Sequence, residues 1–368
     1  MSTTAEVSIP KTHKACVYSD IGRCAIEVRE VETPEPGPGE VLVKLTHSGV
    51  CHSDYGLMMN SWKHLPLPTP PGQIGGHEGL GHIVKLGDGA HKAGVRVGDR
   101  VGIKWVSSAC LSCPPCVEGM EGICFNQKIS GYYTPGTFQE YVIGPANYVT
   151  PVPSSLPGEI AAPMLCAGVT TYAALRKSGA RAGQWVVVSG AGGGLGTVAT
   201  SLAARGMGFR VVGVDAPEKR DGVLESGAEH FVDVSAFSDD GIGKEVKRLT
   251  GWGASAVIVC TSSNRAYAQA LGMLRFGGTL VCVGMPEGEP VPIANAFPSR
   301  MVVQELRIVS SAVGNRADAA ATLDMAARGD VVVRFPVRTV GLGDLQAVFE
   351  DMARGKIVGR VVLDFSKT

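Results

Sequence analysis

Four cysteines that stand close together in the chain have the spacing of a metal-binding loop. Cys110, Cys113, Cys116 and Cys124 follow the pattern C-x2-C-x2-C-x7-C, and four thiolates so spaced can hold one zinc ion in a tetrahedral site. The prolines and glycines between them form the tight turns that such a loop requires. Four cysteine ligands leave no open position, so the pattern predicts a structural zinc. The alternatives are an iron–sulfur cluster, whose bacterial ferredoxin pattern has a shorter last gap followed by proline, and thiols without metal.

A run of glycines predicts a site for a dinucleotide. The run stands between an apolar segment and a helical pattern, and consists of Gly190, Ala191, Gly192, Gly193, Gly194, Leu195 and Gly196. A glycine-rich turn of this kind brings backbone N–H groups to a pyrophosphate at the positive end of a helix. Asp215 stands about 20 positions further on, where a carboxylate binds the ribose hydroxyls and repels a 2′-phosphate. We therefore predict NAD rather than NADP, although the glycines alone would also fit a plain turn.

The segments around this run alternate between strand and helix patterns. Residues 185–189 and 210–215 are rich in β-branched side chains, as buried strands are. Between them, apolar residues recur at helical spacing, namely Leu195, Val198, Ala199, Leu202 and Ala203. Further strands are predicted at 231–234, 256–260 and 279–283. Such alternation predicts an α/β fold with a parallel, doubly wound sheet.

The rest of the chain has the pattern of a mainly β domain. Short strand patterns broken by Gly and Pro recur early in the chain, for example at 40–45, 81–86 and 101–105. Similar patterns return near the end, at 337–340 and 361–365, and we expect them to rejoin the first domain. A length of 368 residues fits two domains.

Composition excludes several classes of function. Lys plus Arg and Asp plus Glu number 34 each, so the formal net charge is zero and nothing favours nucleic acid or an anionic membrane as a partner. No apolar run is long enough to span a bilayer, and residues 1–14 show no signal or transit peptide. We therefore expect a cytoplasmic protein whose ten cysteines serve as metal ligands or catalytic groups rather than as disulfides.

Cys51, His77 and Cys166 are three further candidates for metal binding, but spacing alone does not join them. A single cysteine is usually a small buried hydrophobic residue. A single histidine is more often a hydrogen-bonded core residue than a metal ligand. From the residues alone, the role of these three side chains stays open.

Several segments taken together resemble the zinc-dependent medium-chain alcohol dehydrogenases of the fungal, yeast type. The likeness runs in the same order along nearly the whole chain, and its segments are 49–54, 75–82, the four-cysteine run, 103–105, 165–168 and 314–318. It implies a GroES-like, mainly β catalytic domain made of residues 1–166 and 313–368, with a structural-zinc lobe at about 107–126. Residues 167–312 would form an NAD-binding Rossmann domain, and the subunits would form a homotetramer or homodimer.

The resemblance also implies a role for each residue near the second metal. Cys51, His77 and Cys166 would hold a catalytic zinc, a ligand set typical of alcohol dehydrogenases, with substrate or water in the fourth position. Asp54 would orient the imidazole of His77. Glu78 would lie behind the metal and assist ligand exchange there. The hydroxyl of Ser53 would begin a proton relay.

Three cations are implied as coenzyme contacts. His52 and Arg360 would meet the pyrophosphate and Arg220 the adenosine ribose, although Arg220 and Arg360 would also fit ordinary surface positions. Because an open zinc position lowers the pKa of a bound alcohol, the implied reaction is hydride transfer to or from NAD(H). Its substrates would be primary or secondary alcohols, or the corresponding aldehydes or ketones.

This sequence also departs from the yeast-type pattern. Gly56 stands where the family carries the histidine that ends its proton relay, so the proton must leave into water or by another route. In the substrate pocket Trp62 and Trp105 match, but Met58 replaces a Trp and Ala312 replaces a Tyr. We expect a larger pocket that accepts substrates bulkier than ethanol, although Met58 would also fit as core filler.

Three alternatives to an alcohol dehydrogenase differ in what they require of the sequence. A zinc-free quinone or enoyl reductase that uses NADPH would lack the metal ligands and would not favour Asp215. A zinc reductase acting on a specialised biosynthetic carbonyl, such as an aryl or secondary alcohol dehydrogenase, fits the altered pocket. A non-catalytic zinc protein on the same fold would be expected to lose one of Cys51, His77 and Cys166, and all three are present.

Overall fold

The structure, a computed structural model, divides the chain into two compact units. The first consists of Met1–Cys166 together with Val337–Thr368, and the second of Ala167–Pro336. The described residues are 8–62, 65–329, 337–357 and 359–367.

The segment 313–329 falls in the second unit. Its helix α10 (Arg316–Ala327) packs against α4 (Val169–Lys177), and Arg176 on α4 bonds to Asp318 on α10 at 2.9 Å. The sequence-based boundary groups this segment with the first domain instead. The outer limits of that predicted domain, Met1 and Thr368, and residues 330–336 lie outside the described residues.

The first unit contains the strand-rich ends of the chain. Its strands are β1 (Thr12–Tyr18), β2 (Ile26–Glu32), β3 (Glu40–Val50), β4 (Glu78–Leu86), β5 (Arg100–Ile103), β6 (Val106–Ser108), β7 (Lys128–Ile129), β8 (Tyr141–Pro145), β9 (Thr150–Pro151), β16 (Val337–Val340) and β17 (Arg360–Asp364). Its α-helices are α1 (His52–Met58), α2 (Pro114–Val117), α3 (Gly158–Pro163) and α11 (Leu345–Ala353).

A seven-stranded sheet forms the framework of this unit. Its order is β16-β17-β3-β4-β5-β9, with β8 also paired to β3. All of these pairs are antiparallel except β16 with β17. Because β17 pairs with β3, the C-terminal segment rejoins the first domain, as the sequence predicts. The mainly β character of this domain is also confirmed.

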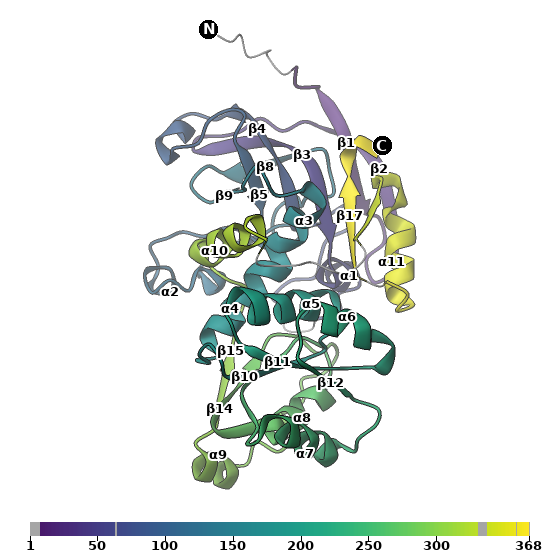
Figure 1. Cartoon of the computed structure of the whole chain (residues 1–368). Coiled ribbons are helices and arrows are strands. Elements are labelled where there is room, and N and C mark those ends of the chain that lie inside the picture. The colour runs from purple at the N-terminus through teal and green to yellow at the C-terminus, as the bar shows by residue number, and fades with distance from the viewer. Residues whose placement is uncertain (1–7, 63–64, 330–336, 358, 368) are drawn as a thin grey trace. The chain divides into compact units, whose positions relative to one another are not determined.

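Helix α11 closes one side of the core of this unit (Figure 1). Phe349 on α11 is fully buried. Its ring centroid lies 6.5 Å from that of Tyr18, 6.0 Å from that of Tyr55 and 6.1 Å from that of Phe138. Met58 packs into the same cluster, so α1 and α11 share one apolar core.

The second unit alternates strands and helices. Its strands are β10 (Trp185–Ser189), β11 (Arg210–Asp215), β12 (His230–Asp233), β13 (Ala254–Val259), β14 (Leu274–Cys282) and β15 (Arg307–Ser310). Besides α4 and α10, its helices are α5 (Gly194–Ser201), α6 (Arg220–Glu225), α7 (Asp239–Thr250), α8 (Asn264–Met273) and α9 (Pro298–Gln304). Strands β10 and β11 have the predicted bounds, and β15 is a strand that the sequence analysis did not identify.

These six strands form one parallel sheet in the order β12-β11-β10-β13-β14-β15. Figure 1 shows α7 and α8 on one side of the sheet and α4, α5 and α6 on the other. The predicted doubly wound sheet is confirmed. Strand order reverses between β10 and β13, and ligands of such sheets bind beyond the carboxyl ends of the strands at this point.

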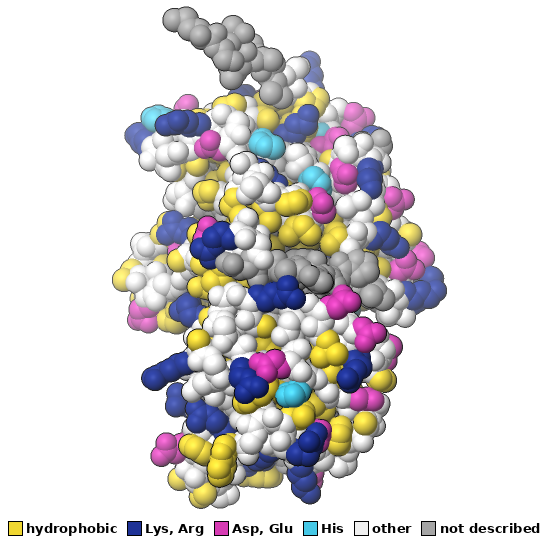
Figure 2. All heavy atoms as spheres, viewed as in Figure 1, with side chains coloured by type: hydrophobic (Ala, Val, Ile, Leu, Met, Phe, Trp, Pro, Cys, Tyr) yellow, Lys and Arg dark blue, Asp and Glu magenta, His cyan; other side chains and the backbone are white. Residues whose placement is uncertain are grey.

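The surface carries charges of both signs. On the face shown in Figure 2, Lys and Arg side chains are interspersed with Asp and Glu. Within the described ranges, no helix is both long and apolar enough to cross a membrane.

Truncating Phe349 tests the packing of α11. We expect Phe349→Ala to lower the free energy of unfolding of the first unit by about 3–5 kcal/mol, because a buried aromatic ring is replaced by a cavity. Urea unfolding followed by circular dichroism measures this. The control Val97→Ala trims a side chain that is 57% exposed and should stay within about 0.5 kcal/mol of the parent protein. Equal losses in the two variants would contradict the observed packing.

Candidate active site

Cys51, His77 and Cys166, which are far apart in the sequence, meet in the first unit. Cys51 precedes α1, His77 precedes β4, and Cys166 lies in a π-helical turn, Met164–Gly168, after α3. Their ligand atoms and a carboxylate oxygen of Glu78 all lie within 4.8 Å of one another. Two thiols and one imidazole at these separations fit a zinc ion, whose bonds to nitrogen and sulfur are about 2.0–2.3 Å long.

A single carboxylate positions two of these ligands. Asp54 Oδ1 accepts a hydrogen bond from His77 Nδ1 at 2.7 Å, and Oδ2 accepts one from the backbone N–H of Cys51 at 3.0 Å. Because an ionised carboxylate only accepts, the imidazole proton stays on Nδ1. His77 Nε2, which lies 3.3 Å from Cys166 Sγ, therefore keeps its lone pair for a metal. Such a carboxylate partner orients most metal-binding histidines.

The neighbours of the cluster shift its pKa values. Burial lowers the pKa of His77, but the charge and hydrogen bond of Asp54 outweigh it, so this pKa lies well above its ordinary range. A metal ion that binds Nε2 therefore displaces the proton there, while Asp54 keeps the proton on Nδ1. A hydrogen bond from Cys166, together with His77 and Arg360, holds the pKa of the Cys51 thiol well below its usual value. The thiolate is the form of cysteine that binds metals, so the surroundings favour a metal ligand at Cys51.

Beside the cluster, Glu78 and Arg360 form a buried ion pair. Burial raises the pKa of Glu78 to about 7, while the charge of Arg360 opposes this effect. Gly49 makes the arrangement possible, because a Cβ atom there would lie 1.8 Å from Glu78 Oε2. The guanidinium of Arg360, for which the resemblance implies a coenzyme contact, here bonds to a carboxylate 282 positions away. No local pattern could have revealed that partner.

Aromatic rings pack against the imidazole of the cluster. The centroid of Trp105 lies 4.9 Å from that of His77 with the ring planes at 87°, and Trp62 meets Trp105 at 6.2 Å. Gly56 is buried beside Trp62, since a Cβ atom at Gly56 would contact the indole at 3.6 Å. The space that the family histidine would occupy at position 56 is therefore bordered by Trp62.

The remaining predicted residues differ in how deeply they are buried. Met58 is fully buried in the core cluster under α11, not in the cluster of Trp62. It thus occupies a core position, the alternative that the sequence left open. Ser53 is half-buried on α1, and His52 is exposed at the first position of that helix. Ala312 is exposed and belongs to the second unit.

The four remaining predicted ligands also come together. Their sulfur atoms lie within 4.8 Å of one another, and they belong to Cys110, Cys113, Cys116 and Cys124. Backbone N–H groups donate to these sulfur atoms at 3.3–3.4 Å. Such bonds, from Ser112 first and then Cys113, lower the pKa of Cys110 to about 5. Leu111 has a φ of 59°, a strained value for a branched residue that persists where the surroundings impose it. The lobe thus fits one tetrahedral metal ion.

The glycine-rich run forms the turn between β10 and α5 in the second unit. Gly190 has a φ of 81°, which glycine adopts without strain. Gly196 allows the helix to approach the turn, because a Cβ atom there would lie 2.0 Å from the carbonyl oxygen of Gly190. Asp215 lies against this turn, where its Oδ2 accepts a hydrogen bond from the backbone N–H of Gly192 at 2.7 Å. The acidic residue and the glycines are therefore adjacent, as a dinucleotide site requires.

A lysine that the sequence analysis missed completes this arrangement. Lys219 Nζ lies 3.3 Å from Asp215 Oδ1, at a separation of four residues. No sequence pattern pointed to this pair, because Asp215 ends a strand and Lys219 lies in a short 3₁₀ helix, where a spacing of four carries no signal. Arg220, which the resemblance places beside the ribose, holds its guanidinium 5.7 Å from the ring centroid of Phe231.

Comparisons with known proteins agree with both units. Residues 37–154 match the family described as "Alcohol dehydrogenase GroES-like domain", and residues 194–328 match "Zinc-binding dehydrogenase". The chain is 56% identical to alcohol dehydrogenase 2 of Emericella nidulans over 98% of this chain and 100% of that protein. It is 40% identical to an alcohol dehydrogenase of Schizosaccharomyces pombe, with 98% and 100% covered.

Solved structures are similar as well. The fold matches that of acetophenone reductase from Geotrichum candidum, determined in complex with NAD, with a TM-score of 0.81. That protein is 27% identical in sequence, and the match covers 97% of this chain and 98% of the other.

A methyl group added at Gly196 tests the turn. We expect Gly196→Ala to lower the free energy of unfolding of the second unit by about 1–3 kcal/mol, because the new Cβ atom overpacks against the backbone. It should also weaken NADH binding, measured by fluorescence titration. The control Gly222→Ala adds a methyl group in α6 where nothing lies within 4 Å, and should be neutral or stabilising by up to about 1 kcal/mol. A Gly196→Ala variant as stable as this control would contradict the close approach.

Proposed function

Because this chain belongs to the zinc-dependent medium-chain alcohol dehydrogenase family, we propose that it transfers a hydride between NAD(H) and a primary or secondary alcohol. In reverse, the substrate is the corresponding aldehyde or ketone. One observation carries the proposal, namely the cluster of Cys51, His77 and Cys166, in which the buried imidazole is bonded to Asp54. Three protein ligands leave a fourth position for a substrate, as catalytic zinc sites do.

In this proposal the residues around the cluster have separate tasks. Cys51, His77 and Cys166 hold a zinc ion, which when bound lowers the pKa of an alcohol and polarises a carbonyl. Asp54 keeps the imidazole proton on Nδ1, and Trp105 packs against the ring and shields it from water. The hydroxyl of Ser53 would take up the proton of the alcohol as it passes its own proton on. Since Gly56 carries no side chain that could pass the proton on, the route ends in water.

The second metal has a structural role in the proposal. Cys110, Cys113, Cys116 and Cys124 hold a zinc ion in a closed site. Its task is to fix the lobe, in which Leu111 adopts its strained conformation.

We assign NAD as the coenzyme because of Asp215. Its carboxylate beside the glycine turn can accept hydrogen bonds from ribose hydroxyls, whereas a 2′-phosphate would meet its negative charge. Lys219 holds this carboxylate from the other side. His52 and Arg360 are proposed to face the pyrophosphate and Arg220 the adenosine ribose, as in the family.

The proposed substrates are bulkier than ethanol. Ala312 stands where the yeast-type enzymes carry a Tyr, and a smaller side chain leaves more room. The similar fold of acetophenone reductase, whose name denotes an aromatic ketone, also supports a substrate larger than ethanol.

A homo-oligomer, a homotetramer or homodimer, belongs to the proposal. Val302 and Val303 on α9 are 75% and 83% exposed, and Ile308 on the edge strand β15 is 37% exposed. An exposed apolar edge of this kind is often covered by a second copy of the chain. We further propose a cytoplasmic location, because none of the ten cysteines forms a disulfide and six of them make up the two metal clusters, which need reduced thiols.

Metal content and turnover together test the function. We expect the protein to contain two zinc ions per chain and to reduce NAD with alcohols, read as NADH absorbance across a panel from ethanol to benzyl and secondary alcohols. Cys166→Ser should lose one zinc ion per chain. Its kcat/KM should fall by more than the roughly 10–100-fold that is typical when a residue hydrogen-bonded to a metal ligand is replaced.

The control for this experiment is Cys24→Ser, which removes a thiol outside both clusters and should keep both ions and full activity. Zinc found only in the four-cysteine lobe would refute the ligand assignment. Two bound zinc ions without turnover of any alcohol, aldehyde or ketone would refute the activity.

Replacing Asp215 tests the coenzyme assignment. We expect Asp215→Ser to lower kcat/KM for NAD by about 10–100-fold, because charge-assisted hydrogen bonds to the ribose are lost. The kcat/KM for NADP should rise, because the variant no longer repels a 2′-phosphate. The control Asp221→Ser removes an exposed acidic residue of α6 and should leave both values unchanged. A parent protein that prefers NADP would overturn the assignment.

A further inference from the structure

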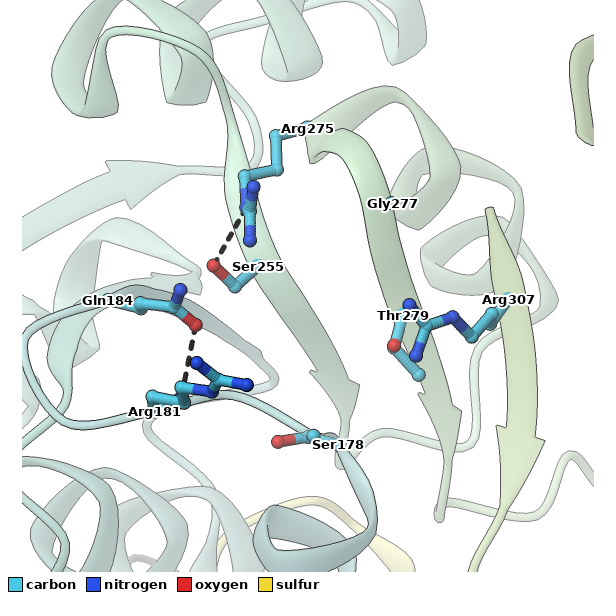
Figure 3. Close-up of a pocket in the computed structure, with 9 residues that line it drawn as sticks. Ser178, Arg181, Gln184, Ser255, Arg275, Gly277, Thr279 and Arg307 are labelled. Carbon is cyan, nitrogen blue, oxygen red and sulfur yellow. Dashed lines mark hydrogen bonds between the residues drawn. The ribbon is translucent and has the colours of Figure 1, made fainter. Parts of the chain in front are cut away.

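The second unit contains a cavity that the proposed function does not use. Its volume is about 310 Å³, and it is lined mainly by polar and charged side chains. Figure 3 shows the guanidinium groups of Arg181, Arg275 and Arg307 directed into the same space. We call this cavity, with its three arginines, the arginine pocket.

Each arginine comes from a different segment of the unit. Arg275 on β14 donates from Nε to the hydroxyl of Ser255 at 2.9 Å. Arg307 begins β15, where its register partner is Thr279. Arg181 lies in the loop before β10, and its backbone N–H donates to the side chain of Gln184 at 3.0 Å. Strand pairing and loop contacts thus hold three cations around one cavity.

No carboxylate balances these charges in the described part of the chain. No acidic residue there lines the pocket, and none forms an ion pair with any of the three arginines. Other arginines of the same unit are paired, for example Arg210 with Glu229 and Arg248 with Glu245, both at 2.7 Å. Three guanidinium groups around one cavity repel one another, so a bound anion would be favoured there.

The arginine pocket lies at the opposite end of the sheet from the glycine-rich turn. Gln184 precedes β10, Ser255 is near the start of β13, and Arg307 begins β15. The glycine run follows the carboxyl end of β10. Because all six strands are parallel, the pocket is at the amino ends of the strands. It is therefore separate from the dinucleotide turn.

We propose that the arginine pocket binds a small anion of the phosphate class with at least two negative charges. The planar fork of an arginine matches phosphate oxygens with two parallel hydrogen bonds, and three forks can surround a diphosphate. The volume is near the lower end of small-molecule sites, about 300–1,000 Å³. The hydroxyls of Ser255 and Thr279 add polar groups to the lining. The anion is inorganic pyrophosphate or the phosphate groups of a free nucleotide, which share this chemistry.

Isothermal titration calorimetry on the zinc-loaded full chain tests the site. Pyrophosphate, phosphate, ADP and citrate are titrated at constant ionic strength, because salt screens exposed charges. Saturating NADH is present so that the dinucleotide turn is occupied. We expect pyrophosphate to bind at one site per chain, and Arg181→Gln and Arg307→Gln each to raise its Kd at least about tenfold. Both arginines are exposed, so neither change should disturb folding.

The matched control is Arg248→Gln, which removes the same charge from an exposed arginine on α7 and should leave the Kd unchanged. Binding that is equally strong in all variants would place the anion elsewhere, at zinc for example, and would overturn the proposal. So would the absence of binding, or tighter binding of citrate than of any phosphate compound. Tighter binding of ADP than of pyrophosphate would show that the phosphate groups belong to a nucleotide. Tighter binding of pyrophosphate would show that the ligand is the free anion.

Light scattering separates a second explanation, in which the arginines contact another copy of the chain. We expect Arg307→Gln to keep the molar mass of the parent assembly. A smaller mass for this variant would assign the arginines to an interface and overturn the proposal. The alcohol dehydrogenase activity is a separate readout, so its failure and the failure of this site remain distinguishable.

Discussion

The double hydrogen bond of Asp54 is the contact on which the metal cluster depends. Its two oxygens hold the imidazole of His77 and the backbone N–H of Cys51, so one rigid group sets the position of two ligands. The carboxylate is fully buried, and a buried charge is tolerated only when it is hydrogen-bonded. The same contact joins the first turn of α1 to the segment before β4. Local helix formation and metal-site geometry are therefore linked through one side chain.

The neighbouring ion pair follows from the order of the strands. β3 lies between β4 and β17, and Gly49 on β3 is the register partner of Glu78 on β4. Arg360 begins β17, next to Val361, whose partner is Val50. Because Gly49 has no side chain, Glu78 and Arg360 can meet across the central strand. A buried pair of this kind gains little net stability, but removal of one partner leaves a costly unpaired charge.

Local patterns explain what could be predicted from the sequence. β10, β11 and the glycine turn were predicted because their signals lie within a few residues, and the parallel sheet follows from their alternation. The cluster of Cys51, His77 and Cys166 needed a resemblance, since His77 and Cys166 are 89 residues apart. The core position of Met58 depends on α11, nearly 300 residues further along the chain. β15 has no alternating pattern and is mostly exposed, so its strand signal is weak. The arginine pocket was equally hidden, because each arginine stands alone in its own segment.

The two ends of the sheet in the second unit carry side chains of opposite charge. At the carboxyl ends, glycine backbone approaches the site and Asp215 supplies a negative charge that Gly192 and Lys219 hold in place. At the amino ends, guanidinium groups meet with no carboxylate among the described lining residues. In the proposed assignments the first end accepts a dinucleotide only when the hydroxyls of its adenosine ribose carry no phosphate. The second end lacks that carboxylate and favours a ligand with exposed terminal phosphates. Because no described residue that lines the second end carries a carboxylate, a phosphate group there meets no negative charge, so the two ends differ in the anions that they can accept.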